Sequence, residues 1–450
     1  MTSILESPAV TPSESASHPI TPAPELALTP TFDPAWPAWF HDTQREAWEE
    51  FLRTPSPTRK DEAWRFANIK AVGLEGFVPA PGFIAATDAI AQSKLFDAAA
   101  ARFVFGNNQL IHRETTNLPQ GVIVKPLSEA ARENESLFRE FFMSQPVELG
   151  SHRFAALHRA MAQGGVMIHV PANVEVALPI EIFHWVEGDN ASVFPHTLIL
   201  CGENSKVTVV DVFKSMDGGR ALACGVNDLH LADGAELTYV AVQDWSPSSL
   251  AFHINSTLVG RNATATALNV NFGSKFLRGE SLSRLNGEGS RSVMLSINPV
   301  DGEREIDQRT LQDHVSPRAT SDLLYQNALD GSARTIFAGL IKVGEGAHET
   351  DAYQKVRNLL LSDDCEANSM PGLEILADNV RCSHGATSGE INEDELFYMQ
   401  ARGITADLGR RLIVAGFFNS LLDRISNTAV RAKLSTLVSA RLGVQTEPES

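Results

Sequence analysis

From Val166 onward, this 450-residue chain repeats short β-branched or alternating apolar runs for about 200 residues. Val207–Phe213, Leu237–Val242 and Ala263–Phe272 are typical of them. No helical period longer than a turn interrupts the series. Many short strands in succession are typical of a stacked β-solenoid or of a β-sandwich, so we expect a mostly β core of one of these two kinds.

Turn clusters separate the runs. Among them are Gly202-Glu203-Asn204-Ser205, Asp233-Gly234-Ala235 and Gly287-Glu288-Gly289-Ser290. Several clusters lie about 26–32 residues apart, although two gaps break the period. This spacing suits the rungs of a solenoid and favours it over the sandwich, which would show the same short strands.

The regions on either side of this core have other patterns. Residues 1–37 are rich in Pro, Ser and Thr, which predicts a disordered tail. Residues 38–162 are predicted to form an N-terminal, mainly helical domain, and residues 163–390 the β core. Residues 391–443 return to a helical period, and residues 444–450 form a second tail.

The C-terminal helical region contains three predicted helices. Asn392 is expected to cap the first and Thr405 the second. The third begins at Asn427 or Thr428, and Gly443 ends it.

Composition narrows the classes of function. The net charge of −18 argues against nucleic acid as a partner, because phosphate binding needs a basic surface. No segment reaches the ~18 apolar residues that span a bilayer, so no membrane partner is expected. The first basic residue is Arg45, and four cysteines form no disulfide framework; both features predict a cytoplasmic protein.

Cys382 and His384 are the strongest candidates for chemistry. They stand two residues apart just before the C-terminal helices, so in an extended strand both side chains project from the same face. A thiolate and a neutral imidazole together suit a soft metal such as iron or zinc. Two ligands do not complete a four-coordinate site, so the others are expected from elsewhere, most simply from another chain.

Several segments resemble the SufB/SufD family of the SUF iron–sulfur cluster assembly machinery, and within it the SufD type. Cys382–Thr387 and Leu396–Ile404 are the most specific of them. The others are Arg59–Phe66, Tyr325–Gly331, Ala352-Tyr353-Gln354, Asn358–Ser362 and Pro371–Ile375.

The resemblance implies a right-handed parallel β-helix between two helical domains. It also implies a subunit that pairs with SufB and holds the ATPase SufC through its C-terminal helical domain. A transient iron–sulfur cluster would form at the SufB–SufD interface, with none bound stably by this chain alone. His384 and Cys382 are the implied cluster ligands. Phe397, Tyr398 and Arg402 would help to shape the SufC-docking domain.

Cys365 departs from the family pattern, because a small residue is usual there. It is expected to be either a buried small hydrophobe or an additional thiol ligand.

Three functions follow from these observations. The first is a non-catalytic scaffold subunit, since the chain has no Gly-x-x-x-x-Gly-Lys-Ser/Thr loop and ATP would be hydrolysed by SufC. The second is a SufB-like homodimer that holds a cluster alone; the lack of a SufB-type upstream cysteine speaks against it, although a homodimer without SufB stays open. The third is a β-helix enzyme acting on polysaccharides. Asp363-Asp364 is the only adjacent acidic pair in the later rungs, and 7% aromatic residues make a poor sugar-binding groove.

Overall fold

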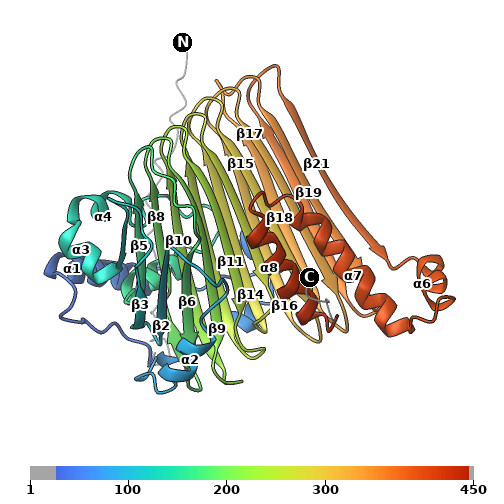
Figure 1. Ribbon diagram of the computed structural model, residues 1–450, viewed down its shortest axis with the longest axis horizontal. Coiled ribbons are helices and arrows are strands. Elements are labelled where there is room, and N and C mark those ends of the chain that lie inside the picture. The colour runs from blue at the N-terminus through green and yellow to red at the C-terminus, as the bar shows by residue number, and fades with distance from the viewer. Residues whose placement is uncertain (1–26, 445–450) are drawn as a thin grey trace, which may run out of the picture.

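The computed structural model describes residues 27–444, and residues 1–26 and 445–450 lie outside the described part. Its centre is a parallel β-solenoid of two facing sheets, drawn in Figure 1 as a row of long strands between two groups of helices. From β8 on, the chain alternates between the sheets, so that each strand pairs with the strand two positions later. The mostly β solenoid that the turn spacing favoured is therefore confirmed.

Sheet A carries the even-numbered strands from β8 to β20, together with four of the first strands. In spatial order its main path is β20 (Glu366–Ile375), β18 (Arg334–Val343), β16 (Glu305–His314), β14 (Phe276–Leu285), β12 (Leu250–Val259), β10 (Ala221–Leu231), β8 (His196–Cys201), β5 (Gly165–Val170) and β4 (Ile123–Pro126), with β1 (Val78–Pro79) and β7 (Ala191–Val193) beside it.

Sheet B faces sheet A across the core. Its order is β21 (Arg381–Glu390), β19 (Asp351–Leu360), β17 (Thr320–Leu329), β15 (Arg291–Val300), β13 (Thr264–Asn271), β11 (Glu236–Asp244), β9 (Lys206–Ser215), β6 (Ile180–Val186), β2 (Ala101–Gly106) and β3 (Gln109–Glu114).

One column of turns sets the rung length. Each rung has one residue with positive φ whose N–H donates to a carbonyl of the next rung, as Asn204 does to Asp233 at 2.9 Å. This conformation favours Gly and Asn. The residues of the column are Asn173, Asn204, Gly234, Asn262, Gly289, Arg318, Glu349 and Asn379. Arg318 is neither Gly nor Asn, which explains why the sequence shows no turn signal at its rung.

The interior of the solenoid is apolar along its sides and polar along its middle. Buried asparagines form a ladder from rung to rung, with Nδ2–Oδ1 distances of 2.7 Å for Asn271–Asn298, 2.8 Å for Asn298–Asn327 and 2.7 Å for Asn327–Asn358. The ladder satisfies amide groups that would otherwise be costly to bury. It fixes the register of the later rungs.

Helices cover the outer faces of both sheets. The N-terminal helices are α1 (Ala38–Arg53), α2 (Ala86–Gln92), α3 (Leu127–Glu133), α4 (Glu135–Phe141) and α5 (His152–Met161), and the C-terminal helices are α6 (Glu393–Gln400), α7 (Ala406–Leu422) and α8 (Thr428–Arg441). Phe154 of α5 stacks on Phe252 of sheet A, and Phe418 of α7 packs against the outer face of sheet B. The predicted caps are confirmed, because Asn392, Thr405 and Asn427 each accept a backbone N–H of the helix that follows.

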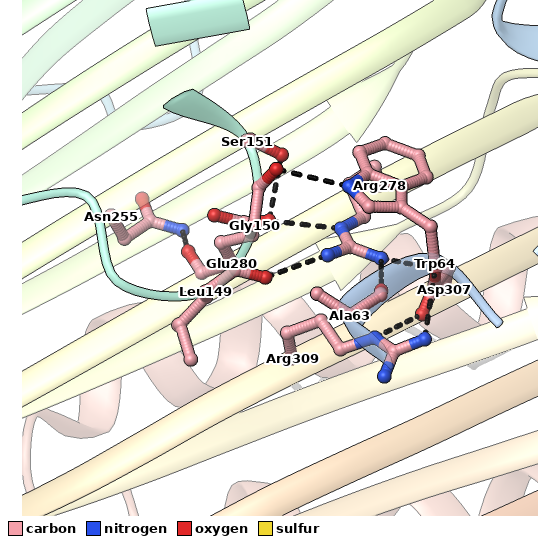
Figure 2. A network of polar contacts seen from close by, with 10 residues as sticks. All are labelled: Ala63, Trp64, Leu149, Gly150, Ser151, Asn255, Arg278, Glu280, Asp307 and Arg309. Carbon is pink, nitrogen blue, oxygen red and sulfur yellow. Dashed lines mark hydrogen bonds and ion pairs between the residues drawn. The ribbon is translucent and has the colours of Figure 1, made fainter. Parts of the chain in front are cut away.

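A buried ionic network fastens the N-terminal segment to sheet A (Figure 2). Arg278 bridges Glu280 and Asp307, with an Nε–Oε1 distance of 2.9 Å to Glu280. Its guanidinium also donates to the carbonyls of Ala63 and Leu149 and lies 4.1 Å from the ring centroid of Trp64. The Arg59–Phe66 motif therefore has a structural role, as the cover of this network.

Two predicted boundaries need correction. The N-terminal tail was expected to be disordered through residue 37, but Leu28 and Trp36 are buried, so packed structure begins no later than Leu28. Short strands within residues 38–162 were also missed. β2 and β4 join sheets B and A, so the N-terminal domain is continuous with the β core. The prediction for residues 1–26 lies outside the described residues.

Candidate functional site

The two ends of the solenoid differ. At the N-terminal end, antiparallel β3 and β4 close the sheets, and β4 is packed beneath α3 and α4. At the C-terminal end, β20 pairs only with β18 and β21 only with β19 within residues 27–444. One backbone edge of each last strand is therefore available to another chain, and we call this pair of strands the open edge.

Cys382 and His384 both lie on β21 at the open edge. Their register partners on β19 are Ala352 and Gln354, which are fully buried and face the interior of the solenoid. In parallel strands, register partners point the same way, so both candidate ligands face inward at a rung that nothing covers. His384 is consequently exposed, and Cys382 is half-buried against Ile341 and Val343. The shared face expected from their spacing is present.

The surroundings of Cys382 favour the protonated thiol. Partial burial, and secondly the negative charge of Asp351, raise the pKa of Cys382, while the backbone N–H of Ala352 opposes them. A thiol that stays protonated is a weak nucleophile but binds soft metals with release of its proton. Because the thiolate is both the nucleophile and the metal ligand, the raised pKa disfavours both roles and does not choose between them.

Cys365 lies away from the other two candidates. It precedes β20, packs beside Leu360 and Ala367, and its Sγ donates to the Ser362 carbonyl at 3.0 Å. Cys382 instead follows β20, whose ten residues span about 30 Å in an extended strand. One metal site within this chain does not include both thiols, and Cys365 is placed as a packing residue.

The open edge is incomplete as a metal site. No group of three or more His, Cys, Asp or Glu residues could hold a metal ion anywhere in residues 27–444. Cys382 and His384 supply donors that fit iron in type, and a four-coordinate centre would take its remaining donors from outside this chain.

Helix α6 follows β21 directly and lies at the far right of Figure 1, beyond the last rung. Its buried Leu396 packs against α7 at Gly409. Phe397 and Tyr398 point away from that contact and are 71% and 59% exposed. The guanidinium of Arg402 lies 3.6 Å from the Tyr398 ring centroid, so the three predicted docking residues form one amphipathic surface.

Two family descriptions match almost the whole described chain. "SUF system FeS cluster assembly, SufBD core domain" matches residues 184–417, and "SufBD protein N-terminal region" matches residues 35–182. This chain belongs to the SufB/SufD family. The SufBD core match contains the open edge, α6 and the first part of α7, so the candidate site lies in the part that defines the family.

Relatives of both types support the family assignment. The chain is 28% identical to the iron–sulfur cluster assembly protein SufD of Escherichia coli, over 88% of this chain and 91% of the relative. It is 26% identical to SufD of Bacillus subtilis over 90% and 94%. Similarity to SufB of Bacillus subtilis is 28% over 66% and 64%. The match to the SufD relatives is thus the longer one.

Within residues 27–444, every helix is too short or too polar to cross a membrane.

Four candidate residues at the open edge were not identified from the sequence. They are the partly exposed apolar residues Leu373, Ile375 and Leu376 and the buried Gln354. Leu373 and Ile375 alternate along β20, which is the signal that could have identified one face of an edge strand.

Proposed function

We propose that this chain is a non-catalytic scaffold subunit of the SUF system, of the SufD type, and that it presents His384 and Cys382 to an iron–sulfur cluster shared with a SufB-type partner. The observation that carries the proposal is the position of both donors on the inward face of the last, uncovered strand. The cluster is the cargo of the scaffold rather than its resident cofactor.

Strand addition at the open edge is the proposed mode of pairing. Partner strands beside β20 and β21 would satisfy the free backbone groups of both and cover Leu373 and Ile375 on β20. The same addition would bring the partner's own ligands next to His384. Four free thiols suit a reducing compartment, and we propose the cytoplasm as the place of assembly.

The surface of Phe397, Tyr398 and Arg402 is the proposed docking site for the SufC ATPase. Exposed aromatic side chains beside an arginine are typical of residues that dominate binding energy at protein interfaces. Because α6 continues directly from β21, nucleotide-driven movement of the ATPase would act on the strand that carries the candidate ligands. Hydrolysis of ATP would belong to that partner.

Replacing His384 with alanine is expected to slow cluster maturation at least about tenfold in a strain that depends on SUF, because one ligand is lost. The measurement is the rate at which an iron–sulfur reporter enzyme gains activity. Ser388→Ala is the matched control, since Ser388 lies on the same face of the same strand. A parental rate for His384→Ala, with the chain still co-purifying with its SufB-type partner, contradicts the ligand role.

Phe397→Glu is expected to weaken binding of the SufC-type ATPase about 10–100-fold, because a carboxylate would be buried in an apolar contact. Titration of the purified ATPase measures the dissociation constant. Leu52→Glu is the control, because Leu52 is 57% exposed on α1 at the opposite end of the molecule. Equal dissociation constants for both variants would show that Phe397 of α6 does not contribute to the interface.

A further inference from the structure

Gln354 lies directly behind His384. The two residues are register partners on neighbouring parallel strands, which lie about 4.8 Å apart, and both face the interior. Gln354 is fully buried, and its Nε2 donates to Oε1 of Gln312 at 3.3 Å. Among the described residues, Oε1 of Gln354 has no hydrogen-bond partner.

Gln354 belongs to a hydrogen-bonded chain that leads deeper into the solenoid. Nε2 of Gln312 donates to Oγ of Ser321 at 2.7 Å and to the Tyr353 carbonyl at 3.2 Å. The same Ser321 Oγ lies 2.7 Å from Nε2 of the buried His314. These hydrogen bonds hold the nitrogen side of the Gln354 amide, so the amide has little freedom to move.

A glycine on the opposite sheet makes room for this arrangement. A Cβ added at Gly339 would lie 2.3 Å from Nε2 of Gln354 and 2.6 Å from Oγ1 of Thr310. Those distances are shorter than any van der Waals contact, so a larger residue would displace the amide. The sequence thus places Gln354, Gln312 and Gly339 so that the amide of Gln354 is held one rung behind the open edge.

A buried carbonyl without a partner costs about 1–3 kcal/mol, so the oxygen favours any donor within reach. The ring of His384 is the neighbouring side chain in register, and a neutral imidazole carries one N–H and one unprotonated nitrogen. Metal-binding histidines usually donate their second ring N–H to such an acceptor, which sets the tautomer and the orientation of the ring.

We propose that Gln354 is a positioning residue for His384: the exposed ring of His384 turns to donate one ring N–H to the unpartnered Oε1 of Gln354, so that the other ring nitrogen stays unprotonated and faces the open edge. The hydrogen bond itself needs no metal. Its use in holding a cluster rests on the function proposed above.

The test is ¹⁵N NMR of the histidine rings in the full chain alone at pH 8, where an ordinary imidazole is neutral. The His384 signals are assigned as those absent from His384→Gln. The parent is expected to show a single His384 tautomer. Gln354→Met removes the acceptor at similar volume and is expected to give both tautomers, whereas Gln354→Glu keeps an acceptor and is expected to give one.

Gln326→Met is the matched control, because it removes a buried amide of the same kind on the neighbouring strand β17, where its Nε2 donates to Ser420 of α7 and not toward β21. It is expected to leave the His384 spectrum unchanged. A mixture of tautomers in the parent overturns the proposal even if no variant folds, as does an unchanged spectrum in Gln354→Met. The measurement requires neither partner nor cluster, so a single tautomer together with normal maturation by His384→Ala would refute the ligand role and leave the hydrogen bond standing.

Discussion

Arg278→Met is expected to lower the free energy of unfolding by about 3–5 kcal/mol, because it leaves Glu280 buried without a cation and leaves Asp307 with Arg309 as its only cation. The side chains of Arg278 and Asp307 are 0% exposed and that of Glu280 is 2% exposed, so water does not replace the lost partner. The carbonyls of Ala63 and Leu149 lose their donor in the same substitution. Urea unfolding followed by circular dichroism measures the change.

Arg284→Met is the matched control for this experiment. Arg284 also bridges two carboxylates, Asp313 at 2.8 Å and Glu148 at 2.6 Å, but its side chain is 22% exposed at the rim of the sheet. Partly solvated ion pairs contribute about 0–1 kcal/mol, so its loss is expected to be small. If the two variants lower the free energy of unfolding by similar amounts, burial of the Arg278 network does not determine how much it stabilises the fold.

A second large decrease in the free energy of unfolding is expected when the pH is lowered. Burial lowers the pKa of four histidines, to about 3 for His158 and His184 and to about 4 for His253 and His314. Their pKa in the unfolded chain is about 6.5, so below that pH the unfolded state binds more protons than the folded state. The stability that these neutral histidines contribute is therefore fully present above pH 6.5 and is lost as the pH falls. At pH 5, the loss is about 2 kcal/mol for each histidine.

One buried carboxyl opposes this trend. Burial raises the pKa of Asp211 to about 7, so the folded state binds the extra proton between about pH 7 and pH 4 and gains stability there. That gain is similar in size to the loss from one histidine, so the net expectation at pH 5 is a loss of several kcal/mol. Urea midpoints at pH 7.5 and pH 5 check it, and His314→Gln is expected to reduce the difference. Equal midpoints for the parent at both pH values would show that these histidines are not buried in neutral form.

The fold was largely predictable because its turns repeat. The column of positive-φ residues leaves a Gly or Asn signal at most rungs, and the strands between them have the expected period. Arg318 hides one rung, since local propensity gives no sign that it adopts this conformation, whereas Gly344 and Gly346 still mark the turn that contains Glu349. β2 was missed for another reason: a six-residue strand among helices becomes recognisable only through its partner β6.

The candidate site was predictable only where its residues are close in sequence. A period of two places Cys382 and His384 on one face, and the family resemblance attaches a role to them. Gln354 is 30 positions before His384 and becomes its neighbour only through the register of the last two rungs of sheet B. For Cys365 the sequence left open a packing role and a ligand role, and its position at the other end of β20 from Cys382 favours packing.

The difference between the two ends of the solenoid also limits the size of the assembly. Stacked parallel rungs with two matching ends could continue from molecule to molecule into a filament, as cross-β fibres do. Here β3, a six-residue antiparallel strand that ends in Arg113 and Glu114, occupies one end and interrupts the parallel repeat. Growth would then stop once two molecules have joined, and the joint would lie in the middle of a finite particle with a closed end on either side.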